Sequence, residues 1–143
     1  GIYVVIKRGA PYPSFVNFDA SARLACTVQR SRTNTPLQAL TLLNDPVYVE
    51  AAKSMATRVL TERAEATVEE QLTFAFRLAT SRAPDDREQA ILLNLLETQK
   101  SLKRDDALKK NPPAPQGVSA ADYRAWVSVT TALINLHETI MHH

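Results

Sequence analysis

The sequence is poor in glycine and cysteine, and it has no long apolar run. Its 143 residues include three glycines, Gly1, Gly9 and Gly117, which lie too far apart to form a glycine-rich loop that cradles phosphates. A single cysteine permits no internal disulfide. No apolar stretch approaches the roughly 20 residues that a membrane-spanning helix needs. We therefore expect a soluble domain without a nucleotide loop, a disulfide framework or a membrane span.

Basic residues are also too few for a nucleic-acid module. The formal net charge is +2. Residues 1–34 hold five basic residues against one acidic residue, which gives +4 and leaves −2 on the rest of the chain. Nucleic-acid-binding domains usually combine a much larger positive charge with clustered Lys and Arg and with stacking aromatic residues. We expect no nucleic-acid partner.

The C-terminal histidines come close to a zinc-protease motif but miss its spacing. The motif H-E-x-x-H requires a second histidine four residues after His137, where this chain has Met141, and His142 follows one position later. One extra residue turns the side chain by about 100° around a helix, so the two imidazoles would not face one metal ion. The chain also has no C-x-x-C-H motif for covalent haem. We expect no metal site and no cofactor.

Residues 1–34 have the pattern of an extended, irregular arm. Pro11 and Pro13 fix their own backbone angles and disfavour helix at the residues before them, and residues 16–19 are predicted to continue as a loop. The apolar run from position 2 to position 6 is too short for periodicity to distinguish a strand from a truncated helix. Because exposed apolar surface favours association, we expect copies of the chain to contact one another through this apolar run. The residues concerned are Ile2, Val4 and Ile6.

From Thr35 onward, helix-start signals predict an all-α fold of about five helices in an irregular bundle. Each start combines a capping side chain with a proline, an acidic first turn or a capping box. The starts lie at Thr35, Asp45, Thr67, Asp85 and Ser119. The proline-containing residues 105–117 predict an internal linker, within a single domain that covers residues 1–143.

Two of these helices carry apolar patterns that predict their packing. Residues 90–96 place apolar side chains on too broad a face for a surface helix, so we expect that helix to be covered on two sides. The last helix is expected to continue to residue 140, with one apolar stripe that faces a partner helix. The stripe consists of Trp126, Val129, Leu133, Leu136 and Ile140.

The candidate functional residues are Arg30, Arg32 and Cys26, although no complete catalytic constellation accompanies them. The two arginines are two positions apart in an extended segment, so their side chains should point the same way. Two interpretations stay open: structural ion pairs, which we favour, and a pocket for an anion or a partner. We interpret Cys26 as a small buried residue rather than a nucleophile, because nothing in the sequence places His137 beside it as a base.

Aromatic residues in the arm leave one further alternative. Tyr12, Phe15 and Phe18 lie among or near the prolines and could stack on sugar rings. We favour the simpler interpretation that these rings attach the arm to the helical body. Carbohydrate binding is the third and weakest of the functions considered.

Several segments together resemble one protein family. The most specific is the run from Arg30 to Leu40, which contains Arg-Thr-Asn-Thr-Pro-Leu-Gln-Ala-Leu. Further matching segments are Tyr3–Arg8, Ala10–Ser14, Phe18–Ala20, Cys26–Val28, Leu42–Asp45, Glu50–Ala52, Phe76–Pro84 and Ala132–Glu138. With these segments the chain resembles the planctomycete-specific domain of unknown function that ends large proteins. Many of those proteins begin with a planctomycete cytochrome-type domain.

The resemblance implies a setting rather than a reaction. It implies an exported, periplasmic parent protein of several domains, in which this chain is the C-terminal part of a longer family domain. The family has no established activity, so no catalytic residue can be transferred. We expect a non-catalytic helical domain with a structural or binding role against the upstream domains of its parent. The alternative is that Arg30, Arg32 and Cys26 contribute to an enzyme site that those domains complete.

Overall fold

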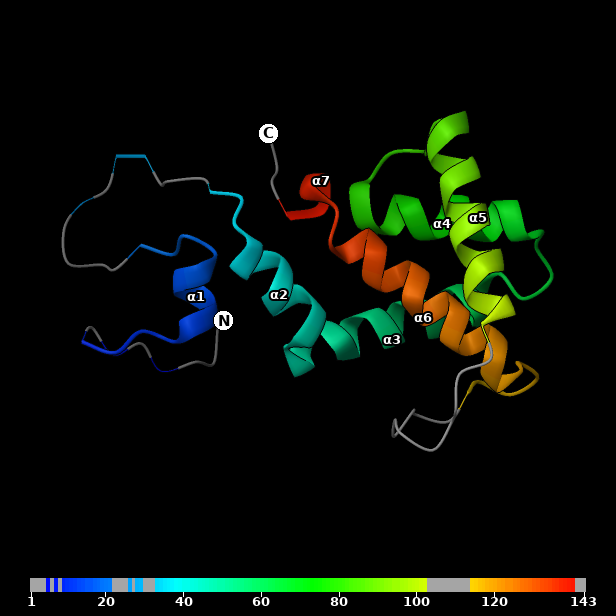
Figure 1. Ribbon diagram of the computed structural model, residues 1–143, viewed down its shortest axis with the longest axis horizontal. Helices are drawn as coiled ribbons and strands as arrows, with labels where there is room; N and C mark the ends of the chain where they lie inside the picture. Colours follow the sequence, from blue (N-terminus) through cyan, green and yellow to red (C-terminus); the bar gives the residue numbers. More distant parts are fainter. Residues whose placement is uncertain are drawn as a thin grey trace.

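The computed structural model describes residues 5, 7, 9–21, 26, 28–29, 33–102 and 114–140. About 69 % of the chain is helical and the described residues form no strand, which confirms the all-α prediction. The helices are α1 (Pro13–Asn17), α2 (Pro36–Asn44), α3 (Pro46–Glu62), α4 (Val68–Thr80), α5 (Asp86–Ser101), α6 (Ala120–Ile134) and α7 (His137–Ile140). α1 and α2 lie at one end of the molecule and α4 and α5 at the other (Figure 1).

All five predicted helix starts are confirmed. Thr35, Thr67 and Asp85 each accept a hydrogen bond from the backbone N–H three residues later. The Gln or Glu side chain at that later position accepts from the N–H of the capping residue in return. These capping boxes pair donors that a helix start otherwise leaves unsatisfied. Asp45 and Ser119 cap α3 and α6 with their side chains, and Asp45 alone separates α2 from α3.

α6 is the central helix of the bundle. It packs mainly against α3 and α5 and also contacts α4. The side chains of Trp126, Val129 and Leu133 are almost fully buried, and they share one hydrophobic core with Phe76 of α4 and Leu96 of α5. Burial of a large apolar side chain typically contributes about 1.5–3 kcal/mol. The core therefore lies between α6 and the three helices around it.

Two polar side chains of α6 fix its position on α3. The hydroxyl of Thr130, which is fully buried, lies 2.9 Å from the carbonyl oxygen of Ala52 and can donate to it. The hydroxyl of Tyr123 donates to the carbonyl oxygen of Lys53 at 3.3 Å. Because buried hydroxyls need a partner, these two contacts favour one register between the helices.

The last helix is shorter than its apolar stripe predicts. α6 ends at Ile134, and α7 follows as a separate short helix. The hydroxyl of Thr139 donates to the carbonyl oxygen of Leu133 at 2.8 Å, so α7 folds back onto the end of α6. Leu136 is 37 % exposed. The prediction of one continuous stripe is therefore right from Trp126 to Leu133 and wrong beyond it.

Two other predictions also need correction. A short helix, α1, replaces part of the expected loop, with Pro13 near the helix start, where the missing N–H of proline costs nothing. α5 is not covered on two sides, since Leu92 and Leu96 are buried whereas Ile91 is 58 % exposed. Its apolar residues are more numerous than its neighbours can cover.

Two further predictions, the internal linker and the apolar run near the N-terminus, concern segments that lie partly or wholly outside the described residues. Of the expected linker at 105–117, the described residues are 114–117, which lead into a turn where the N–H of Val118 donates to the carbonyl oxygen of Pro115. Residues 105–113 lie outside the described part, as do Ile2, Val4 and Ile6. None of the described helices combines the length and the apolar character needed to cross a membrane.

Candidate functional site

A buried glutamine ties the N-terminal arm to α2. Gln38 is 2 % exposed. Its amide nitrogen donates to the carbonyl oxygen of Asn17 at 2.8 Å and to the hydroxyl of Thr33 at 3.2 Å. Its amide oxygen accepts from the N–H of Thr35 at 3.1 Å. Gln38 thus completes the capping box of α2 and also anchors a segment that precedes it by 21 residues.

Three further side-chain contacts hold the arm in place. The hydroxyl of Ser14 donates to a carboxylate oxygen of Asp45 at 3.1 Å, next to the start of α3. The side-chain amide of Asn17 donates to the hydroxyl of Thr41 at 3.1 Å. Asp19 accepts from both the N–H and the hydroxyl of Thr33, at 2.7 and 2.8 Å. Together with Gln38, these bonds fix α1 and its flanks on the inner side of α2.

The outer side of α2 is apolar and exposed. Leu37, Leu40 and Leu43 are 53 %, 56 % and 51 % exposed, and Val47 at the start of α3 is 67 % exposed. We call these four residues the α2 face. They recur every three or four positions, and no charged residue lies between positions 33 and 44. Single exposed apolar residues are common on proteins, whereas a contiguous group rimmed by polar residues usually marks an interaction surface.

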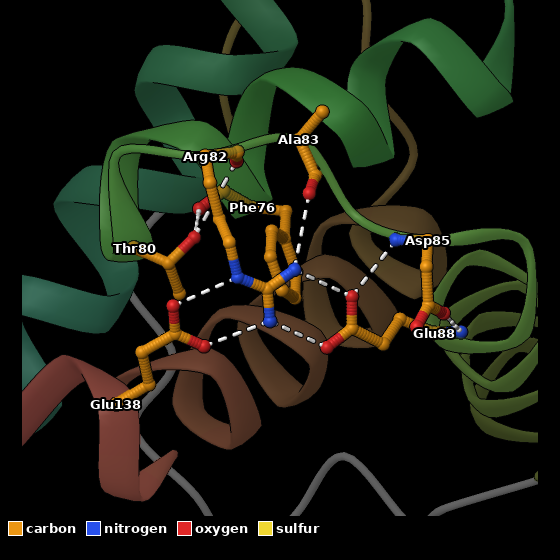
Figure 2. Close-up of polar contacts among 7 residues, drawn as sticks. All are labelled: Phe76, Thr80, Arg82, Ala83, Asp85, Glu88 and Glu138. Atoms are coloured by element: carbon orange, nitrogen blue, oxygen red, sulfur yellow. Dashed lines mark hydrogen bonds and ion pairs between the residues drawn. The ribbon is translucent and has the colours of Figure 1, made fainter.

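A second polar cluster is centred on Arg82, which sits between two carboxylates and above an aromatic ring (Figure 2). α4 ends at Thr80, and the left-handed backbone of the capping residue Ser81 (φ 65°) turns the chain into this position. The guanidinium donates two hydrogen bonds to Glu88 of α5 and two to Glu138 of α7, at 2.7–2.8 Å. Its central carbon lies 4.9 Å from the ring centre of Phe76.

Arg82 has no donor left for a ligand. A guanidinium carries five N–H groups, and the fifth contact goes to the carbonyl oxygen of Ala83 at 3.1 Å. The arginine therefore joins the end of α4 to α5 and α7 rather than forming an anion pocket. It also covers one face of the buried Phe76 ring, as a cation does in a favourable cation–π contact.

The cluster shifts the pKa of its groups in the expected directions. Hydrogen bonds from Arg82, and then from the N–H of Asp85, lower the pKa of Glu88 from 4.5 to about 2. The two carboxylates raise the pKa of Arg82, with Glu88 contributing most. Glu88 is consequently ionised at any pH near neutrality, and the cluster is fully formed there.

Arg82→Met should lower the melting temperature by roughly 3 °C at pH 7, because two ion pairs that join three helices are lost. The folded-state pKa of Glu88 is below its ordinary value, so its ionised form stabilises the fold fully above pH 4.5. That stabilisation is lost as the pH falls from 4.5 through about 2. The difference in melting temperature between the variant and the original chain should shrink over this window. Circular dichroism at pH 7, 4.5 and 2 measures it.

Arg58→Met is the matched control for this prediction. Arg58 also pairs with a carboxylate, Glu62, and also lies over a ring, that of Phe74 at 5.9 Å. That ion pair stays within one helix and is about half exposed, so its loss should change the melting temperature by less than about 1 °C. Equal effects of the two substitutions would show that the Arg82 cluster adds nothing beyond an ordinary surface pair.

The residues singled out in the sequence have different outcomes. Arg30 and Arg32 lie outside the described residues, so both the structural ion pairs and the pocket for an anion or a partner stay predictions. Cys26 is exposed and forms no disulfide, so its interpretation as a buried residue is wrong. Among the residues that the structure describes, no group of three or more His, Cys, Asp or Glu is placed to hold a metal ion.

The aromatic residues of the arm pack against other rings. The rings of Tyr12 and Phe15 meet edge to face with centres 5.6 Å apart, and Phe18 lies 5.9 Å from Tyr48 of α3. The contact between Phe18 and Tyr48 attaches the arm to the helical body, as the simpler interpretation predicts. Tyr12 is 48 % exposed and keeps part of its ring free.

A family model described as PSD1, protein of unknown function (DUF1553), matches residues 1–96. The chain belongs to this family. The matched part of this PSD1 chain includes the Gln38 anchor, the α2 face, Arg82 and Glu88, whereas Glu138 follows it. Comparisons with curated proteins and with solved structures find no match.

Proposed function

We propose that this PSD1 chain is a non-catalytic helical domain that packs against another domain of its parent protein through the α2 face. The observation that carries the proposal is the exposure of Leu37, Leu40 and Leu43 on α2 and of Val47 at the start of α3, while the other side of α2 is held by the hydrogen bonds of the buried Gln38. A rigid apolar face loses little conformational entropy on binding. The polar cluster at Arg82 supports the non-catalytic part of the proposal, because all five N–H donors of the guanidinium bond within the fold and none is left for a substrate.

The size of the α2 face favours a covalently linked partner. Its four side chains expose on the order of 400 Å², which is about the size of a large apolar patch on a monomer. Stable complexes between separate proteins usually bury about 800 Å² on each partner. A domain in the same polypeptide faces the surface at a high effective concentration, so a smaller area is enough to hold it. This reasoning favours an upstream domain of the parent over a freely diffusing protein.

The setting that the family resemblance implies is part of the proposal. It consists of an exported, periplasmic parent from a planctomycete, in which the upstream region often starts with a cytochrome-type domain. The PSD1 match itself says nothing about further domains, so the multidomain parent rests on the resemblance alone. A second contact surface, around Ile2, Val4 and Ile6, would then bring two copies of the chain together.

The double variant Leu37→Lys/Leu40→Lys tests the proposal. In the 143-residue chain alone, both side chains are more than half exposed, so the free energy of unfolding should change by less than about 0.5 kcal/mol. In the full-length parent, the charged face should separate from its partner domain. Limited proteolysis between the domains should then become about tenfold faster, because domain separation exposes the connecting segment.

Ile91→Lys is the control, since Ile91 is exposed to a similar degree on α5, at the other end of the molecule. It should leave the proteolysis rate of the parent unchanged. An unchanged rate in the double variant would contradict the proposal. Sedimentation of the isolated chain separates the alternatives: a dimer lost in the double variant assigns the α2 face to a second copy, whereas a dimer lost in Val4→Asp assigns self-association to the N-terminal run.

A further inference from the structure

An apolar groove lies between the start of α4 and the C-terminal half of α5, away from the α2 face. α5 crosses α4 instead of running along it, and the two helices are in contact (Figure 1). The groove has a volume of about 580 Å³, which is within the range of ~300–1,000 Å³ typical of ligand sites. Val68, Leu93 and Leu96 supply its apolar lining. Thr67, Glu69, Glu97 and Lys100 complete it.

Two carboxylates line the groove, and neither pairs with a cation in the part of the chain that the structure describes. Lys100 is already engaged, because its ammonium lies 2.9 Å from a carboxylate oxygen of Asp122 on α6. The hydroxyl of Thr73 donates to the backbone carbonyl oxygen of Glu69. The carboxylates of Glu69 and Glu97, in contrast, have no ion pair or hydrogen bond with another described residue. The neighbouring Glu70 differs, because its carboxylate accepts from the N–H of Thr67 in the capping box. The groove therefore combines an apolar lining with two carboxylates that no cation of the described residues pairs with.

We propose that this groove binds a basic amphipathic helix of a partner protein. A groove between two helices can take the apolar ridge of a third helix. An apolar occupant would also remove water from Glu69 and Glu97, which is costly unless the occupant brings positive charge. Lys or Arg residues beside its apolar ridge supply that charge and the matching potential.

The same two carboxylates argue against other partners. Nucleic acids and anionic membranes present dense negative charge, which Glu69 and Glu97 would repel. A purely apolar helix would leave both carboxylates next to a dry surface without a counter-charge. The partner helix must therefore carry positive charge beside its apolar ridge.

A labelled peptide of about 14 residues, with leucine on one face and lysine on the other, serves as the probe. Its binding to the 143-residue chain is followed by fluorescence anisotropy, and its position by the amide shifts of the isotope-labelled chain. The lysine peptide should bind at least about tenfold tighter than the same peptide with glutamate in place of lysine. The largest shifts should fall in residues 67–69 and 93–100.

Glu69→Gln/Glu97→Gln should weaken binding of the lysine peptide about fivefold, as expected for two exposed ion pairs. The matched control is Asp86→Asn/Glu50→Gln, which removes the same charge from the first turn of α5 and from α3. It should weaken binding by less than about twofold. Circular dichroism checks that both variants keep the helical fold.

Three results would overturn the proposal. Equal weakening by the two double variants would show only long-range attraction to an acidic surface. Equal or absent binding of the lysine and glutamate peptides would show that the groove does not select a basic helix. A dimer of the chain alone that disappears in Glu69→Gln/Glu97→Gln would assign the groove to a second copy of this chain.

Discussion

Leu133→Ala should lower the free energy of unfolding by about 3 kcal/mol, whereas Leu136→Ala should lower it by less than about 1 kcal/mol. The two leucines are three positions apart, and the sequence pattern places both on one stripe. Leu133 is 1 % exposed within the core, but Leu136 follows the end of α6 and is 37 % exposed. Removing the first leaves a cavity, while removing the second mainly removes surface. Urea denaturation of the two variants gives the comparison.

This pair also tests where the last helix ends. A continuous helix to residue 140 would bury Leu133 and Leu136 alike, and both substitutions would then cost several kcal/mol. Similar losses would therefore contradict the break after Ile134 and the separate α7. The m-value should stay the same in both variants, because neither changes the surface exposed on unfolding.

The helix starts were predictable because their signals are local. Thr35, Thr67 and Asp85 lie three residues before Gln38, Glu70 and Glu88, so each capping box can be read within four residues of sequence. The end of α6 has no comparable signal. No glycine or proline follows Ile134, and the apolar spacing continues through Leu136 and Ile140. The contact between Thr139 and the carbonyl of Leu133, which closes the turn, is visible only in three dimensions.

The polar clusters were less predictable than the helix starts, because their partners are far apart in the sequence. Arg82 and Glu138 are 56 residues apart, and Gln38 and Asn17 are 21 residues apart, so no spacing rule connects them. Arg82, Gln38 and Glu138 do lie in the segments that carry the family resemblance, but a resemblance without a known activity assigns no roles. The α2 face was missed because its leucines have the spacing of a buried stripe. Only the packing reveals that the opposite side of α2, with Gln38 and Leu42, is the one that is buried.

Gln38→Leu should release the N-terminal arm from α2 without unfolding the bundle. Leucine has a similar size, but it cannot donate to the carbonyl oxygen of Asn17 or accept from the N–H of Thr35. Each buried group left unpaired costs about 1–3 kcal/mol. The arm contacts the rest of the chain mainly at α2 and the start of α3. Detaching the arm therefore costs less free energy than unfolding the bundle. Hydrogen exchange at the amides of Phe18 and Ala20 should become at least about tenfold faster.

Gln71→Leu is the matched control, since it makes the same substitution at a second buried glutamine. Gln71 is 8 % exposed, and its amide nitrogen donates to the carbonyl oxygen of Arg63 at 2.7 Å, in the turn between α3 and α4. Loss of the Gln71 bond should lower the stability of the whole bundle. Hydrogen exchange at the arm amides should then become faster only as far as global unfolding becomes more frequent, with no additional local opening of the arm. Because the inner bonds of α2 also orient its outer side, Gln38→Leu should reproduce part of the proteolysis effect of Leu37→Lys/Leu40→Lys in the parent protein. Unchanged exchange at Phe18 and Ala20 in Gln38→Leu would show that the aromatic contact between Phe18 and Tyr48, rather than Gln38, holds the arm.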